Sequence, residues 1–229
     1  MPTKEKKERR SYAKRDPKEF NWFRKWFLFA VTKFGYMIRY KLVYRLEVLG
    51  KENIPKTNSY IVAANHLSTS DPPLICGIMP HPVGYMAKQE LFEIRFLRWW
   101  LDWLGAFAVN REKLGPSTIK TVKALKERGW VLGLFPQGTR CEPGIIDDVT
   151  KGFVNLAKLT KCDILPVGIV GTQETKHLPF TGKITVKIGK VISYDGDVDE
   201  MIKKWIKSIE ELTGFRYIGK EYEEEERRT

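Results

Sequence analysis

The sequence predicts an α/β fold in which a central, largely parallel sheet carries helices on both faces and is preceded by N-terminal amphipathic helices. From about residue 40, short runs of β-branched and aromatic residues alternate with longer stretches of helical periodicity. The runs 59–65 and 130–136 are almost continuously apolar, which is typical of central strands covered on both sides. No repeat or low-complexity linker divides the 229 residues. We therefore expect one α/β domain over residues 41–214.

In the first half of this domain, strands alternate with two helices of different character. The expected strands are 42–50, 59–65, 82–87 and 106–110. A short helix should follow Pro72 and Pro73, and an aromatic helix should cover residues 90–105. The large apolar side chains of the aromatic helix suit either the core or a wall for a lipid chain, and the sequence leaves both readings open.

The second half continues the alternation. A helix is expected over residues 117–129, with Ser117 as its N-cap and Gly129 just past its end. The remaining expected elements are a strand at 130–136, a helix at 151–161, strands at 164–170 and 183–194, and a helix at 198–214. The tail 215–229 is highly charged and is expected to fray.

The basic charge of the chain is concentrated before residue 52. Residues 1–51 hold 15 Lys and Arg against 5 Asp and Glu, whereas residues 52–229 hold 25 against 23. Residues 1–19 are too polar to pack and are expected to form a mobile basic arm. An anionic partner implied by the net charge of +12 would therefore meet the N-terminal segment and not the α/β domain.

Residues 20–40 have the pattern of an amphipathic, membrane-associating helical segment. At helical period, one face collects Phe23, Phe27, Ala30, Val31, Phe34, Met37 and Ile38, and the opposite face collects Lys25, Lys33 and Arg39. The longest uncharged run has seven residues, far fewer than the roughly 20 that span a bilayer. Such a helix suits an interface of anionic membrane lipids, although it would also suit packing on its own domain. The apolar face and the near-neutral domain argue against a nucleic-acid partner.

The cysteines indicate a reducing compartment. Cys76, Cys141 and Cys162 are odd in number, scattered and without metal-ligand spacing. We therefore expect neither a disulfide framework nor a metal site. As a separate expectation, the protein needs no bound cofactor.

Polar residues follow the ends of several expected strands. His66 follows the strand 59–65, Lys88 follows 82–87, and Arg111 follows 106–110. The segment FPQGTR closes the strand 130–136 in the same way. Because ligands of open α/β sheets bind outside the carboxyl ends of the strands, these groups should converge on one site.

His66 and Asp71 allow two interpretations. Asp71 followed by Pro72 suits the N-cap and first turn of a helix, which needs no chemistry. Alternatively, the imidazole of His66 could take a proton from a substrate hydroxyl while the carboxylate of Asp71 holds its other nitrogen. Their spacing alone does not decide between the two.

The other polar groups suit an anionic substrate. Arg111 and Arg140 offer planar forks that match phosphate, and Lys88 offers a point charge. Gly138 and Thr139 allow a tight backbone and a hydroxyl donor beside Arg140. The combination suggests an alcohol nucleophile on a phosphorylated or otherwise anionic molecule.

These blocks resemble the motifs of the glycerolipid acyltransferases. Asn65-His66 with Asp71, GAFAVNR (105–111), FPQGTR (135–140) and LPVGI (165–169) appear in the order seen in that family. The resemblance covers about residues 40–195 and is greatest to bacterial 1-acyl-sn-glycerol-3-phosphate acyltransferases, which carry NHxxxxD, a glycine-to-arginine motif, FPEGTR and a proline-valine motif. The bacterial members also have an N-terminal amphipathic region for membrane attachment.

The resemblance implies a reaction and roles for residues. A fatty acyl chain would pass from a thioester of coenzyme A or acyl carrier protein to the free hydroxyl of lysophosphatidic acid, giving phosphatidic acid without an acyl-enzyme. His66 looks like the general base and Asp71 like its orienting partner. The positions that match substrate-binding residues are Lys88, Arg111, Gln137, Gly138, Thr139 and Arg140. Pro166 and Val167 match the last motif.

One departure from the family pattern leaves the acceptor open. Gln137 stands where the family usually has glutamate, so the acceptor could instead be glycerol 3-phosphate, an ornithine lysolipid or another lysolipid. A non-catalytic membrane-binding protein on the same scaffold is a further alternative. In either case we expect a peripheral or monotopic protein on the cytoplasmic face of the cell membrane.

Overall fold

The computed structural model describes residues 14–109, 115–173, 180 and 182–219. Within them, seven strands form a central sheet in the order β1-β8-β7-β2-β5-β3-β4, and every neighbouring pair is parallel except β7 and β8. The strands are β1 Glu47–Leu49, β2 Tyr60–Ala64, β3 Val83–Lys88, β4 Phe107–Val109, β5 Val131–Leu134, β7 Asp163–Val170 and β8 Thr185–Ile188. The predicted α/β class and largely parallel sheet are confirmed.

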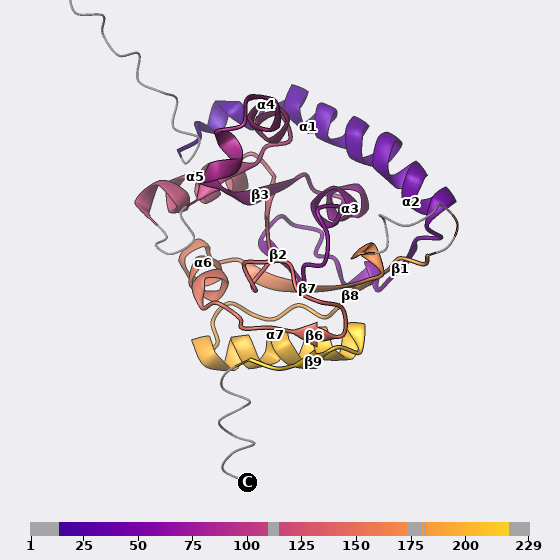
Figure 1. Cartoon of the computed structure of the whole chain (residues 1–229). Coiled ribbons are helices and arrows are strands. Elements are labelled where there is room, and N and C mark those ends of the chain that lie inside the picture. The colour runs from indigo at the N-terminus through magenta and orange to yellow at the C-terminus, as the bar shows by residue number, and fades with distance from the viewer. Residues whose placement is uncertain (1–13, 110–114, 174–179, 181, 220–229) are drawn as a thin grey trace, which may run out of the picture.

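Helices cover both faces of the sheet (Figure 1). The helices are α1 Trp22–Phe29, α2 Met37–Val43, α3 Asp71–Ile78, α4 Arg95–Trp103, α5 Pro116–Glu127, α6 Gly152–Thr160 and α7 Val198–Thr213. On one face α3 contacts β3 and is itself covered by α1, α2 and the π-helical turn η2 (Ala30–Tyr36) that joins them. On the other face α6 and α7 pack on β2 and β7, and α5 packs beside α6.

The core forms where the apolar runs of the sequence become central strands. All five residues of β2 are buried, as are all four of β5. The indole of Trp205 on α7 is fully buried and donates a hydrogen bond to the carbonyl of Ala63 at 3.0 Å. Gly168 lets α7 approach β7, because a Cβ there would lie 2.6 Å from the Cβ of Leu212. This packing fixes the carboxyl end of β2, which leads to His66.

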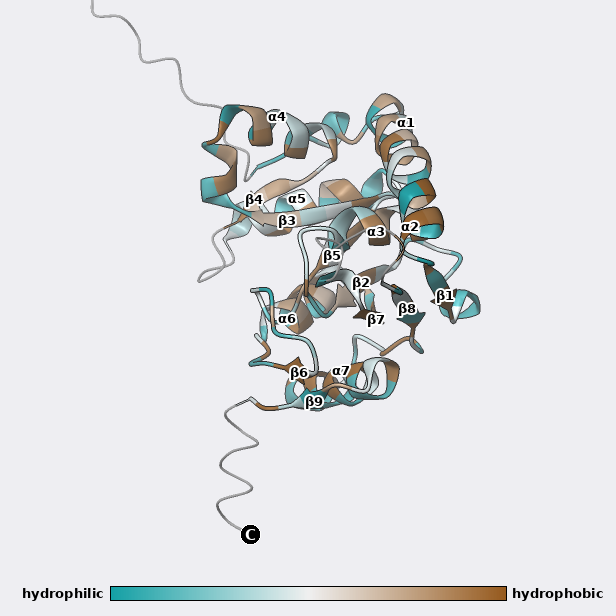
Figure 2. Ribbon diagram, turned by 45° about the vertical axis from the view of Figure 1, so that its right-hand side comes forward, coloured by the Kyte–Doolittle hydropathy of each residue, from teal (hydrophilic) through white to brown (hydrophobic). Residues whose placement is uncertain are grey.

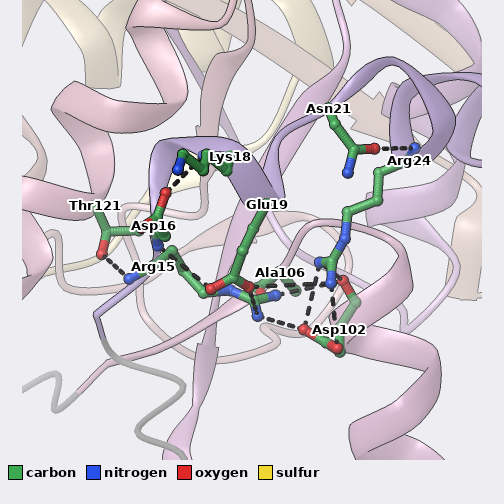
Figure 3. A network of polar contacts seen from close by, with 9 residues as sticks. All are labelled: Arg15, Asp16, Lys18, Glu19, Asn21, Arg24, Asp102, Ala106 and Thr121. Carbon is green, nitrogen blue, oxygen red and sulfur yellow. Dashed lines mark hydrogen bonds and ion pairs between the residues drawn. The ribbon is translucent and has the colours of Figure 1, made fainter.

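The predicted mobile arm is wrong for residues 14–19, which fold onto the domain (Figure 3). The side chain of Arg15 is buried, pairs with Asp102 at the end of α4, and donates to the carbonyl of Ala106 at 2.9 Å. Its backbone N–H donates to the hydroxyl of Thr121 on α5 at 3.0 Å. Arg24 on α1 also pairs with Asp102, so one carboxylate joins three segments. Residues 1–13 lie outside the described part.

The expected strand 42–50 is wrong in its first half. Helix α2 continues to Val43, and only Glu47–Leu49 pairs with β8. Tyr40 and Tyr44 are buried, and the Tyr40 hydroxyl donates to the carbonyl of Ser70 at 3.0 Å. Packing against the loop before α3 therefore outweighs the local β propensity of this segment.

Three smaller expectations are also corrected. Ser117 is not the N-cap of α5, because the helix begins at Pro116 after Gly115. The strand expected over 183–194 ends at Ile188, and only Ile192 forms a further bridge, to Ile164. The fraying tail does not begin at 215, because β9 (Arg216–Tyr217) pairs with β6 (Ile145–Ile146). Residues 220–229 lie outside the described part.

Candidate active site

The loop after β2 is held to the neighbouring strand by an asparagine. The buried side chain of Asn65 donates to the carbonyl of Ile169 at 2.9 Å and accepts from the same residue's N–H at 2.7 Å. This pair of bonds copies the backbone pairing of a strand just beyond the point where β2 ends. It sets the direction in which the chain leaves the sheet and places His66 at the carboxyl edge.

His66 and Asp71 are hydrogen-bonded. The Nδ1 atom of His66 lies 2.7 Å from Oδ2 of Asp71, which is the first residue of α3 and is fully buried. The same oxygen accepts the backbone N–H groups of Leu67 at 2.7 Å and Ser68 at 2.8 Å. Since an ionised carboxylate only accepts, Nδ1 carries the proton and Nε2 is left as the acceptor for a substrate.

The capping interpretation of Asp71 is therefore wrong. The N-cap position of α3 is occupied by Ser70, and Asp71 follows it at the first helical position. The bonds of its Oδ2 run back to His66, Leu67 and Ser68, and not forward to the N–H groups of the helix. The carboxylate organises the loop that carries the histidine, and this is the arrangement that base chemistry requires.

A second loop, residues 135–141 after β5, encloses His66 from another side. The ring of Phe135 stacks on the imidazole with centroids 3.9 Å apart and planes 12° apart. The N–H of His66 donates to Oε1 of Gln137 at 3.3 Å, and its carbonyl accepts from the N–H of Cys141 at 2.8 Å. The sequence order of these residues could not reveal these contacts, because they depend on the pairing of β2 with β5.

Gln137, one of the predicted substrate-binding residues, turns its amide toward groups of the protein. The residue is buried, its Oε1 accepts from His66, and its Nε2 lies 3.0 Å from the sulfur of Cys141. Both ends of the amide are thus engaged with groups of the protein.

Three of the remaining predicted residues are exposed around the site and form its rim. Lys88 ends β3 and is exposed, and Thr139 and Arg140 are exposed on the loop after β5. Gly138 adopts φ +73°, a left-handed conformation that suits glycine, and its N–H closes a turn on Phe135 at 2.9 Å. Within the described part, neither Lys88 nor Arg140 has an ion-pair partner. Arg111 lies outside the described residues, two positions after the end of β4.

Two tyrosines next to the site were not anticipated from the sequence. Tyr85 on β3 is buried, stacks on Phe135 at 5.4 Å, and its hydroxyl makes no hydrogen bond within the described structure. Burial, with Cys76 and Asp71 nearby, raises the pKa of Tyr85, which therefore stays neutral. Tyr40, whose pKa burial also raises, bonds the residue before Asp71. Tyr85 lies within β3 and Tyr40 within α2, so neither stands at the strand-end positions that marked the other candidate residues.

The continuous helical segment α1–η2–α2 and the helix α4 present large apolar side chains, most of them aromatic, to solvent. The exposed members are Trp22, Phe23, Trp26, Phe34, Ile38, Leu42, Ile94, Phe96 and Trp99, which we call the apolar face. The brown residues along α1 and α2 in Figure 2 include part of it. Phe23 packs on Trp103 and Phe27 on Trp100, so α1 and α4 lie side by side.

The apolar face differs in part from the predicted face. Met37 packs toward Gly77 of α3 and is partly buried, whereas Trp22, Trp26 and Leu42 extend the exposed set. In the aromatic helix Phe92 is buried, while Phe96 and Trp99 are exposed. No helix among the described residues is long and apolar enough to cross a bilayer.

Comparison with known proteins places the same residues in a family. A family model described as Acyltransferase matches residues 45–170, which include His66, Asp71 and the loop 135–141. The 1-acyl-sn-glycerol-3-phosphate acyltransferase of Bacillus subtilis is 37% identical over 147 residues, which are 63% of this chain and 72% of that protein. The proteins of the same name from Borreliella burgdorferi and Streptococcus pneumoniae are 32% and 31% identical, and the match covers 63% and 69% of this chain. In these two, it spans 59% of the relative's own length.

A solved structure has the same fold. The crystal structure of the 1-acyl-sn-glycerophosphate acyltransferase of Thermotoga maritima superposes with a TM-score of 0.64 at 29% sequence identity. The superposition covers 82% of this chain and 81% of that one.

Proposed function

This chain belongs to the acyltransferase family, and on that premise we propose that it transfers a fatty acyl chain from a thioester to the free hydroxyl of 1-acyl-sn-glycerol 3-phosphate, giving phosphatidic acid. The observation that carries this proposal is the hydrogen bond of 2.7 Å between His66 and the buried Asp71, inside the matched region. A membrane-binding scaffold without a reaction would have no use for an imidazole held in this way. Curated relatives of the chain bear the name of this activity.

In the proposed mechanism, His66 moves one proton. Its Nε2 takes the proton of the acceptor hydroxyl while that oxygen attacks the carbonyl carbon of the thioester. Asp71 stabilises the imidazolium that forms, because its carboxylate accepts from Nδ1. The carbon–sulfur bond then breaks, and the departing thiolate takes the proton from the imidazolium. One ester and one free thiol result, and no covalent acyl-enzyme is needed.

Cationic side chains at or just after the strand ends would hold the acceptor phosphate. We assign this role to Lys88, Arg111 and Arg140, and we assign the shape of the loop to Gly138 and Thr139. Support comes from the placement of Lys88 and Arg140 at the carboxyl edge of the sheet with no ion-pair partner in the described residues. Guanidinium groups in such positions match the geometry of phosphate oxygens.

The apolar face would place the protein on the membrane that contains its substrate. Aromatic rings partition into the interface, while Lys25 and Lys33, which lie over the ring of Phe29, would meet anionic headgroups. We propose peripheral attachment at the cytoplasmic face of the cell membrane, where thioesters of coenzyme A or acyl carrier protein are the donors.

The reaction is tested with purified protein, acyl-CoA or acyl carrier protein thioester, and anionic vesicles that contain lysophosphatidic acid. Formation of phosphatidic acid with one equivalent of free thiol is the expected result. Glycerol 3-phosphate and an ornithine lysolipid are supplied in parallel as competing acceptors. If lysophosphatidic acid is not acylated with either donor but another acceptor is, the proposed acceptor is wrong and the proposed acyl transfer stands. Failure of every acceptor with a folded, vesicle-bound protein would refute the proposal.

A further inference from the structure

We propose that Phe135 is a positioning residue for the general base, because its ring fixes the orientation of the His66 imidazole. Gln137 has a related role, because it fixes the backbone of His66. The inference rests on the proposed function, because it concerns the step in which His66 takes the proton. Its basis is the stack of Phe135 on the imidazole, together with the bonds from the loop 135–141 to both backbone polar groups of His66.

The hydrogen bond to Asp71 does not by itself fix the imidazole. It restrains Nδ1, but the ring can still swing about the line from Nδ1 to Oδ2, and this swing would move Nε2. A flat ring 3.9 Å away and nearly parallel blocks the swing on one side. The position of Nε2 relative to the acceptor hydroxyl is therefore set by Asp71 and Phe135 together.

Phe135 is in turn supported from the sheet. Tyr85 of β3 stacks behind it with planes 16° apart, so three rings lie nearly parallel. Gly133 of β5 makes room for the third ring, because a Cβ there would lie 2.6 Å from Cζ of Tyr85. The stack therefore begins in the buried core and ends on the base.

The backbone of His66 is fixed by the same loop. Its N–H donates to Gln137 and its carbonyl accepts from Cys141, while the other end of the Gln137 amide reaches the Cys141 sulfur. The loop after β5 thus holds His66 at both of its backbone polar groups. Gln137 thus acts through the backbone of His66, and each end of its amide is engaged with a group of the protein.

The stack also lies where charge develops. When His66 takes the proton, its imidazolium forms against the face of the Phe135 ring, and an aromatic face attracts a cation. This contribution arises in the transition state and not in the ground state. Loss of the ring should therefore lower kcat and leave KM nearly unchanged.

The test compares Phe135→Leu with Phe135→Tyr in the full-length protein, with acyl-CoA and lysophosphatidic acid in vesicles. We expect Phe135→Leu to lower kcat by about 10²-fold, the effect of a misplaced reacting group, with KM for both substrates within about twofold. Phe135→Tyr keeps the ring and should restore kcat to within about threefold of the native value. The matched control is Phe153→Leu on α6, where the buried ring packs on Trp205 at 5.7 Å; it should lower Tm but not kcat.

Variants of Gln137 distinguish a role in positioning the base from a role in binding the acceptor. Gln137→Glu keeps an oxygen for the His66 N–H, whereas Gln137→Leu removes it. We expect Gln137→Leu to lose at least about tenfold in kcat and Gln137→Glu to lose less, both with nearly native KM for lysophosphatidic acid. A raised KM as the main effect in either variant would show that Gln137 contacts the acceptor, which would overturn its role here.

The outcomes for Phe135 are distinct from those for the reaction itself. If the native protein makes no phosphatidic acid, the proposed function is wrong, and the positioning role that rests on it is wrong with it. If the native protein is active and Phe135→Leu keeps its kcat, or Phe135→Tyr does not restore it, the positioning role is wrong. If Phe135→Leu does not fold, Phe135→Met takes its place, and a folded Phe135→Met variant that keeps the native kcat would equally refute the positioning role.

Discussion

At the scale of single residues, Asp71 fixes both the His66 side chain and the loop that carries it. One of its oxygens accepts three donors, from His66, Leu67 and Ser68. Asp71→Asn keeps the shape but loses the charge that stabilises the imidazolium, and its amide group offers donors where donors already point. We expect kcat to fall by ~10²–10⁴-fold with little change in KM. Steady-state kinetics of acyl transfer measures this, and a variant that retains kcat would exclude Asp71 from the mechanism.

The cysteines give a second prediction at this scale. Burial raises the pKa of the Cys76 thiol to about 12, so its thiolate is scarce at pH 7 to 9. Cys162 is also buried, while Cys141 is partly exposed and its pKa is raised less strongly by partial burial. We expect iodoacetamide at pH 8 to label Cys141 first, and all three cysteines only after unfolding. Mass spectrometry of the labelled peptides checks this, and early labelling of Cys76 would contradict the buried position of α3.

The proposed catalytic pair could be predicted from the sequence, but the residues that position His66 could not. His66 and Asp71 are five residues apart, so their spacing and strand-end position were visible. Phe135 lies 69 positions from His66, and its stack exists only because β2 and β5 are neighbours in the sheet. The contact of Gln137 with His66 depends on the same pairing of strands, and the sequence could not show it either.

At the scale of elements, Asp102 joins the N-terminal segment, α1 and α4 (Figure 3). Burial lowers the pKa of Arg15, and the neighbouring carboxylate of Asp102 opposes this shift. Asp102→Asn would leave the buried guanidinium of Arg15 without its main counter-charge. We expect a loss of ~3–5 kcal/mol in the free energy of unfolding, measured by urea denaturation.

The matched control for this element is Asp199→Asn. Asp199 pairs with Lys151 at 2.7 Å, but both side chains are more than half exposed. Exposed pairs contribute ~0–1 kcal/mol, so this variant should unfold almost as the native protein does. Equal losses in the two variants would mean that the Arg15 network does not tie the segments together.

Elements with strong apolar runs could be predicted, and those decided by long-range packing could not. The central strands and α7 lie close to their expected positions because burial on both faces, or an amphipathic period, fixed their type. Residues 42–43 continue a helix because Tyr40 and Tyr44 pack inward beside α3. Residues 14–19 fold because Arg15 finds Asp102, a partner 87 positions away.

At the scale of the whole molecule, the apolar face predicts how the protein meets a membrane. Replacing Trp22, Trp26 and Trp99 by Ser should weaken binding to anionic vesicles by more than tenfold, because each buried aromatic contributes ~1.5–3 kcal/mol. Vesicle sedimentation measures the binding. Leu159→Ser is the control, since this exposed residue lies on α6, across the sheet from the apolar face. Equal effects, or none, would contradict membrane docking through α1 and α4.

The central claim is that a histidine held by two loops of an α/β sheet transfers an acyl chain to lysophosphatidic acid. The most direct measurement is phosphatidic acid formation by the native protein and by His66→Ala, both bound to vesicles and both shown to be folded by thermal unfolding. The account predicts product from the native protein and a loss of at least about 10²-fold in kcat for His66→Ala. A His66→Ala variant that makes phosphatidic acid at the native rate would contradict it.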